Sequence, residues 1–392
     1  MTLLTRQRTA LVITALAAAG ATAALTGVFA SAEPTPPTAA ETPAGGATLT
    51  GGPVQTAVTN ARIPLPTATG KLLGQRIMVG LTGTTANAEL LRHVRAGQVG
   101  AVILFAQNIV DRGQVTALTR TLQRAARQGA NPPLLIAIDQ EGGEVKRFGD
   151  GPPNLSPPQI AATGSTRVAF REGSDTGRYL KARGVNLNLA PVVDVPTSPA
   201  SFIAQQGRAF SFSSAAVTRY ATQFALGLQA RDVAATAKHF PGLGSAPITT
   251  DSKRSELRPS SAQLTGALKP YETLIPQGVD AILVSTAGFP AYDPTGAPAA
   301  LSHRVIGGLL RGRLKFAGVV ITDSLAAPTG HDQIAAGVLA ARAGADILLY
   351  TDDSARVLPA LEADLGAGHM SRTDADASYR RIVALKRLVA AG

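Results

Sequence analysis

Residues 318–323 read GVVITD, an almost continuous apolar run that ends in a carboxylate. Runs of five or six apolar residues suit the strands of a parallel sheet, because helices cover such strands on both faces. Seven further runs of this kind are spaced along the chain, at residues 77–81, 101–105, 134–139, 187–192, 235–240, 281–286 and 345–350. Their starts are 24 to 53 residues apart, which leaves room for a helix after each strand.

The segments between the runs have helical spacing and length, as in residues 86–95, 115–127 and 213–230. Eight strand–helix repeats in about 320 residues predict an α/β fold, a (β/α)8 TIM barrel with a single catalytic domain. A doubly wound open sheet is the alternative, but no Gly-x-Gly-x-x-Gly follows the first run. In a barrel the chemistry lies at the C-terminal ends of the strands, so residues there are the functional candidates.

The composition excludes several classes of function. None of the 392 residues is Cys, which rules out disulfides, thiolate zinc sites and thiol catalysis. Aromatic residues make up 4% of the chain and Trp is absent, which argues against a wide stacking platform for nucleic acid or polymeric sugar. The net charge of +11 is spread without a run of five or six basic residues, so we expect a solvated basic surface and no nucleic-acid partner.

The N-terminus has the pattern of an export signal. Arg6 and Arg8 precede an uncharged apolar stretch that runs to residue 32 and ends in Ala-Ser-Ala, as in a secretory signal peptide. An uncleaved membrane anchor is the alternative, because the stretch is long enough to span a bilayer. We expect a signal peptide at 1–32, a Pro/Thr/Ala-rich linker at 33–70 and the barrel at 71–392, in a secreted or envelope-associated protein. Signal cleavage would leave a charge of +9 and no stable membrane span.

Three strand ends carry the side chains of greatest chemical interest. Asp139 ends the third run, and Arg147 follows it past two glycines that allow the chain to fold back over the same mouth. Lys238 and His239 end the fifth run, although neighbours in an ideal strand face opposite ways. Asp323 ends the seventh run, where a rigid strand would present a nucleophile to a sugar anomeric carbon.

Each of these residues also has a structural interpretation. Asp139 and Arg147 could form an ion pair, and His239 could be a buried, hydrogen-bonded side chain. A single Asp at a strand end is usually a helix N-cap, and that is what we expect of Asp194 and Asp352.

Taken together, the motifs resemble the N-terminal catalytic barrel of glycoside hydrolase family 3, and most closely the single-domain β-N-acetylglucosaminidases (β-N-acetylhexosaminidases) of bacterial cell-wall recycling. The resemblance covers residues 71–391 and rests on a set of motifs in one order. These are GQRIMVG (74–80), GAVILF (100–105), IDQEGG (138–143), LAPVVDV (189–195), RAFS (208–211), KHFPG (238–242), TDSL (322–325) and AGAD (343–346).

The resemblance implies roles for individual residues. Asp323 matches the family's nucleophile, and Asp139 matches the acid that binds sugar hydroxyls. Sugar-binding residues around the −1 subsite are matched by Arg147, Arg208, Lys238 and His239. The implied reaction is retaining hydrolysis through a covalent glycosyl-enzyme, with no metal and no other cofactor.

The loop after the fifth run departs from the family's pattern. The family's N-acetylglucosaminidases carry Asp-Ser-His there, with the His as general acid/base, whereas this chain has Asp251, Ser252 and Lys253. An exposed Lys, with a pKa near 10.4, is a poor proton donor at neutral pH. Three accounts stay open: Asp251 is the acid/base, Lys253 has a lowered pKa in a closed loop, or the site is a weak or inactive relic.

From these observations we expect an exported, monomeric hydrolase that removes terminal β-linked N-acetylglucosamine from cell-wall fragments during peptidoglycan turnover. Its expected partner is a carbohydrate, an amino-sugar glycoside. Three alternatives remain: a catalytically weak or inactive sugar-binding envelope protein, a β-glucosidase-like enzyme of the same family, and a phosphorylase in which Lys253 holds phosphate.

Overall fold

The computed structural model describes residues 63–351 and 356–390, so the predicted signal peptide and most of the predicted linker lie outside the described residues. All of the described residues belong to one compact unit. Ile63 is buried and Leu65 packs against the core, so contacts with the barrel begin before the predicted boundary at residue 71. No helix within the described ranges combines the length and hydrophobicity that a bilayer span requires.

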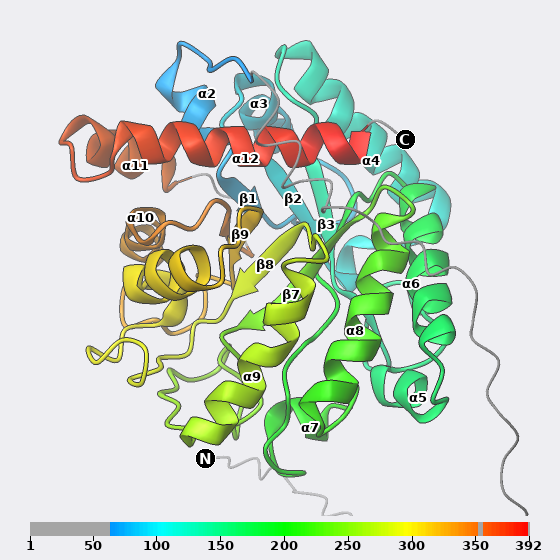
Figure 1. The fold of residues 1–392 in the computed structure, drawn as a ribbon. Coiled ribbons are helices and arrows are strands. Elements are labelled where there is room, and N and C mark those ends of the chain that lie inside the picture. The colour runs from blue at the N-terminus through cyan, green and yellow to red at the C-terminus, as the bar shows by residue number, and fades with distance from the viewer. Residues whose placement is uncertain (1–62, 352–355, 391–392) are drawn as a thin grey trace, which may run out of the picture. The chain divides into compact units, whose positions relative to one another are not determined.

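The described residues form an eight-stranded parallel barrel (Figure 1). Its strands are β1 (Ile77–Val79), β2 (Ala101–Leu104), β3 (Leu135–Ile138), β6 (Leu187–Asn188), β7 (Ala234–Phe240), β8 (Ala281–Val284), β9 (Val319–Thr322) and β10 (Leu348–Leu349). The strands pair in the order β10-β1-β2-β3-β6-β7-β8-β9, and a parallel bridge between Ile321 and Ile347 closes the ring. Each predicted run coincides with one strand, which confirms the (β/α)8 TIM barrel.

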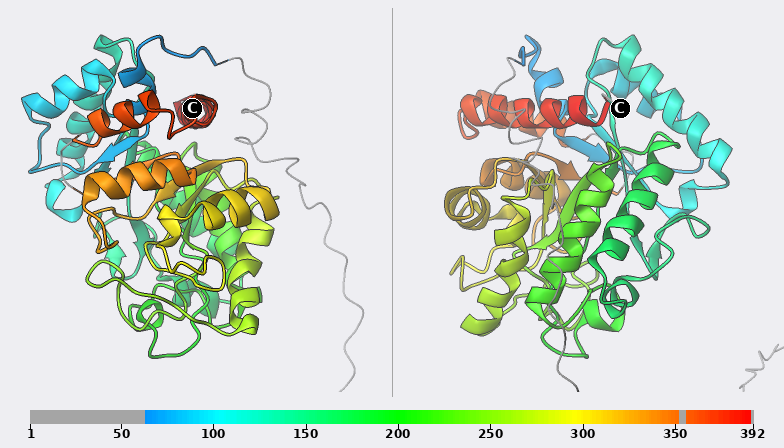
Figure 2. Two further views of the ribbon diagram at one scale, coloured as in Figure 1. Left: turned by 90° about the vertical axis from the view of Figure 1, so that its left-hand side faces the viewer. Right: turned by 45° about the vertical axis from the view of Figure 1, so that its right-hand side comes forward.

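Helices cover the outside of the barrel (Figure 1 and Figure 2). They are α2 (Thr69–Gly74), α3 (Ala88–Ala96), α4 (Arg112–Gln128), α5 (Pro157–Ala162), α6 (Thr166–Lys181), α7 (Phe202–Gln205), α8 (Ser214–Gln229), α9 (Ser261–Leu274), the π-helix η3 (Arg304–Arg313), α10 (Gln333–Ala343), α11 (Leu358–Gly366) and α12 (Arg372–Ala390). The three helices predicted from spacing correspond to α3, α4 and α8. Side-chain caps fix several helix starts: Asp111 accepts from the Gln114 amide at 2.8 Å, and Asp332 from the Ala335 amide at 2.9 Å.

Two apolar cores hold the barrel together. The larger one lies between the strands and the surrounding helices, and the smaller one fills the barrel interior with side chains such as Met78, Ile103 and Leu283. Helix α12 lies across one end of the barrel (Figure 1) and adds Ile382 and Leu385 to the interior core. Because α12 closes the end at which the strands begin, the opposite end is left for a site.

Lys386 on α12 is a lysine at this closed end whose side chain is 0% exposed. Its Nζ donates to Gln75 Oε1 at 2.6 Å and to the Gly100 carbonyl at 2.7 Å. Two carbonyl-type acceptors match the two N–H groups of a neutral amine. Burial lowers the pKa of Lys386 from 10.5 to about 7.

This burial predicts an unusual dependence of stability on pH. Between pH 7 and 10.5 the unfolded state holds a proton on Lys386 that the folded state has lost, so stability rises with pH across this window. Relative to Lys386→Met, the wild type should gain about 2–3 kcal/mol of unfolding free energy between pH 7 and pH 9, measured by urea titration. Lys269→Met, at an exposed lysine on α9, serves as the control. A difference between wild type and Lys386→Met that stays constant with pH would contradict the expectation.

Candidate active site

A cavity of about 490 Å³ opens at the C-terminal ends of the barrel strands. All seven site residues predicted from the sequence line it: Asp139, Arg147, Arg208, Lys238, His239, Asp251 and Asp323. They come from the ends of β3, β7 and β9 and from the loops that follow β6, β7 and the short strand β5 (Val145–Lys146). Lys253 is exposed and does not line this cavity. Asp352, a predicted N-cap, lies outside the described residues.

A small hairpin after β3 brings Arg147 back over Asp139. Strands β4 (Gln140–Gly142) and β5 (Val145–Lys146) pair antiparallel, and Gly142 at the end of β4 has a φ of 103°. A Cβ at Gly142 would lie 2.9 Å from the Leu155 carbonyl oxygen, so this turn requires glycine. Arg147 Nη2 lies 3.3 Å from Asp139 Oδ2, which confirms that the two residues meet.

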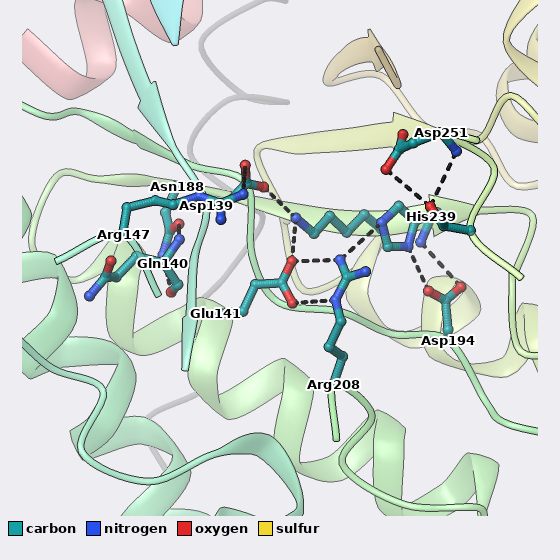
Figure 3. A network of polar contacts seen from close by, with 11 residues as sticks. Asp139, Gln140, Glu141, Arg147, Asn188, Asp194, Arg208, His239 and Asp251 are labelled. Carbon is teal, nitrogen blue, oxygen red and sulfur yellow. Dashed lines mark hydrogen bonds and ion pairs between the residues drawn. The ribbon is translucent and has the colours of Figure 1, made fainter. Parts of the chain in front are cut away.

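Glu141, in the cavity wall, binds two cationic side chains (Figure 3). Its carboxylate accepts two hydrogen bonds from Arg208, at 2.7 and 2.8 Å, and also lies 2.6 Å from Lys238 Nζ. Lys238 Nζ donates in addition to Asp139 Oδ1 at 2.7 Å. Burial acts to raise the pKa of Asp139, but the charges of Lys238 and Arg147 outweigh it and bring the pKa to about 2.

Glu141 belongs to the IDQEGG motif, but no role was predicted for it from the sequence. The missed signal is the spacing, because residues two apart on an extended chain face the same side. Asp139 and Glu141 therefore point together, and both line the cavity.

Lys238 and His239 both face the cavity although they are neighbours in β7. The pairing of β7 with β8 shifts register between Lys238 and Phe240, and the Lys238–His239 peptide bond is cis. Irregular pairing of this kind re-aims side chains at the ends of strands. Because the pairing is irregular here, Lys238 and His239 do not face opposite sides as neighbours in a regular strand would.

Asp194 is a buried partner of His239, and the prediction of a helix N-cap at this position is wrong. Its Oδ2 lies 2.6 Å from His239 Nδ1 (Figure 3). The next helix, α7, begins eight residues later and has Ser201 at its N-cap position. Because β6 is followed by a long irregular segment, the carboxylate faces the neighbouring strand end rather than a helix start.

Asp323 stands at the end of β9, with Oδ1 accepting from the Ser324 amide at 2.8 Å. Burial raises the pKa of Asp323, the nearby Asp251 carboxylate adds to this shift, and the charge of Lys238 opposes it. The net result is a raised pKa for Asp323, and part of this rise comes from repulsion between the Asp323 and Asp251 carboxylates.

Asp251 lies on the loop between β7 and α9, where its side chain is exposed at the cavity wall. Thr249 Oγ1 donates to Asp251 Oδ2 at 3.1 Å and lies 3.2 Å from the Asp251 amide nitrogen. A carboxyl group on an accessible loop can exchange protons with solvent and with a leaving group. In the described part of the chain, no cluster of His, Asp and Glu side chains has the arrangement of a metal site.

Together, the barrel and the charged mouth define the class: a (β/α)8 enzyme with its site at the C-terminal ends of the strands. More particularly, the chain belongs to glycosyl hydrolase family 3, whose N terminal domain matches residues 69–385. The protein is therefore a glycoside hydrolase, as the sequence motifs implied.

Several relatives support this assignment. A secreted glycosyl hydrolase of Arthroderma benhamiae, described as uncharacterized, is 35% identical over 81% of this chain and 93% of its own length. A beta-hexosaminidase of Bordetella parapertussis is 34% identical over 70% of this chain and 78% of its own.

Solved structures are similar in fold as well. A family 3 beta-N-acetylglucosaminidase from Paenibacillus sp. FPU-7 superposes with a TM-score of 0.79 and 33% identity. The match covers 83% of this chain and 63% of that one, so this chain spans under two thirds of the Paenibacillus protein. A beta-N-acetylhexosaminidase from Beutenbergia cavernae superposes with a TM-score of 0.76 and 31% identity, over 82% and 99% of the two chains.

Proposed function

We propose that this chain is an exported glycoside hydrolase that releases terminal β-linked N-acetylglucosamine from cell-wall-derived glycans with retention of configuration. One observation carries the proposal: Asp323 and Asp251 line one cavity with the five residues expected to bind the sugar. The names of relatives, among them beta-hexosaminidase and beta-N-acetylglucosaminidase, support the choice of sugar.

In the first half of the proposed reaction, an Asp323 oxygen attacks the anomeric carbon and forms a covalent ester. The bond from that carbon to the leaving-group oxygen breaks, and Asp251 gives this oxygen its proton. Retaining enzymes keep their two carboxyl groups about 5–5.5 Å apart, close enough for each to reach one face of the same carbon.

The second half reverses the roles. The ester has removed the negative charge of Asp323, which favours the carboxylate form of Asp251 and prepares it to act as a base. Asp251 takes a proton from water, the water oxygen attacks the anomeric carbon, and Asp323 leaves as a carboxylate. Lys253, whose charge had suggested phosphate as acceptor, lies outside the cavity lining, so we propose water as the acceptor.

Buried charges would hold the sugar in this reaction. Asp139 is an acceptor for sugar hydroxyls, and Arg147, Arg208 and Lys238 supply donors fixed by ion pairs. Because these pairs exist before substrate arrives, little reorganisation is needed when the sugar binds.

A panel of aryl glycosides tests the sugar and the role of Asp251. Wild type should hydrolyse aryl β-N-acetylglucosaminides faster than β-glucosides, and proton NMR should show the β anomer first. For Asp251→Ala we expect kcat/KM, which reports the first half of the reaction, to fall about 10²–10³-fold with poor leaving groups and much less with acidic ones, which need no proton. Lys253→Ala is the matched control on the same loop. Equal losses for all leaving groups would exclude Asp251 as the acid/base.

We further propose that residues 1–32 direct export and that the mature protein acts as a monomer in peptidoglycan turnover. The mass of the protein recovered from the envelope or medium would separate a cleaved signal from a retained anchor. Light scattering would test the monomer, and release of N-acetylglucosamine from purified wall fragments would test the substrate.

A further inference from the structure

Asp194 makes an unusual set of contacts for a side chain that is 0% exposed. Oδ2 lies 2.6 Å from His239 Nδ1. Oδ1 accepts from the His239 amide at 3.2 Å and from the Leu243 amide at 2.6 Å. One carboxylate therefore fixes both the backbone and the ring of His239.

We propose that Asp194 is a positioning residue that holds His239 as its Nδ1–H tautomer. Nε2 is then an acceptor at the cavity, where a sugar hydroxyl can donate to it in place of the long 3.4 Å contact from Arg208. The hydrogen bond from a sugar hydroxyl rests on the proposed function, whereas the assignment of the His239 tautomer is independent of it.

The partners of both ring nitrogens select this tautomer. An ionised carboxylate can only accept, so Nδ1 must carry the proton that it shares with Asp194. On the other side, Nε2 lies 3.4 Å from Arg208 Nη2, and a guanidinium can only donate. A proton on Nε2 would face this donor, whereas a lone pair there accepts from it.

Arg208 cannot turn away easily to relieve such a conflict. Its Nε and Nη2 are both bonded to Glu141, which is itself buried. Asp194 thus contacts one ring nitrogen of His239, and Arg208 lies near the other. The ring lines the same cavity as Asp323, so a ligand can reach it from the cavity side.

Asp194 also ties His239 to the root of the loop that carries Asp251. Leu243, whose amide it binds, lines the cavity and begins that loop eight residues before Asp251. Removal of this side chain should therefore disturb both the ring of His239 and the loop root, whereas Asn, which keeps an acceptor oxygen for the Leu243 amide, should disturb the ring alone.

Nitrogen-15 NMR of the imidazole rings tests the proposal directly. The chain has five His, so a His239→Gln variant assigns the His239 signals. At pH 8 the wild type should show the Nδ1–H pattern for this ring. An Nε2–H pattern, an average of the two tautomers or a doubly protonated ring would overturn the proposal. This readout needs no turnover, so it is independent of whether the protein hydrolyses the proposed sugar.

Asp194→Asn extends the test to function. An amide can donate to Nδ1, so we expect the His239 signals to move toward Nε2–H and kcat/KM to fall about 10- to 100-fold. In a His239→Gln background the same substitution should cost little more, because Asp194 acts through the ring. Additive losses in the double variant would overturn the proposal.

Asp280→Asn is the matched control. Asp280 is a carboxylate of similar burial, 1% exposed, that accepts from the Ala235 amide but does not line the cavity. Its substitution should leave both the His239 signals and kcat/KM unchanged. If Asp280→Asn changed them as much as Asp194→Asn does, a general effect of buried charge would replace the proposed role.

Discussion

Replacement of Asp323 by Ala is expected to lower turnover of an aryl β-N-acetylglucosaminide by about 10⁴-fold or more, because the proposed ester forms on the carboxylate that this change removes. The carboxylate is half-buried at a strand end and accepts a hydrogen bond from the Ser324 amide, so its position is defined before substrate binds. Unchanged turnover would exclude Asp323 as nucleophile.

Trapping with an activated 2-deoxy-2-fluoro glycoside identifies the nucleophile independently. The fluorine slows hydrolysis of the ester more than its formation, so the labelled peptide should accumulate and carry the sugar on Asp323. Asp139→Asn is the control, since Asp139 is a carboxylate of the same cavity that we expect to bind sugar only. Its label should form more slowly and still map to Asp323. A label on Asp251 or Asp139 would refute the mechanism.

The barrel could be predicted from the sequence because its determinants are local. Each strand is a short apolar run, and helix starts such as those at Asp111 and Asp332 depend on residues three positions away. The position of Asp323 followed from the same logic, since the end of a strand in a barrel is also the wall of its mouth.

Contacts between distant segments could not be predicted in this way. Asp194 has the appearance of a helix cap in sequence, and only the tertiary fold brings it against His239, 45 residues later. The orientation of Lys238 and His239 was equally hidden, because it depends on a local shift of register between β7 and β8. Glu141 was visible as part of a motif, but its partner Arg208 is 67 residues away.

Among these contacts between distant segments, we expect those of Glu141 to contribute most to the unfolding free energy. Its side chain is 1% exposed and its carboxylate is shared between Arg208 and Lys238. In Glu141→Ala, Lys238 keeps Asp139, but Arg208 loses its bidentate partner and is left with only the more distant carboxylates of Asp139 and Asp194. Removing one partner of such a pair costs about 3–5 kcal/mol. We expect urea titration to show a loss of this size in unfolding free energy, together with weaker substrate binding.

An exposed glutamate provides the comparison that makes this test specific. Glu256 pairs with Arg258 at the surface, where the side chains are 41% and 73% exposed. Water screens such a pair, so Glu256→Ala should cost at most about 1 kcal/mol. The contrast arises because burial removes water as an alternative partner for Arg208, not because the Glu141 pair is intrinsically more stabilising. If Glu141→Ala cost no more than Glu256→Ala, solvent would have to reach Arg208, and the fixed charges expected to position the sugar would not be fixed.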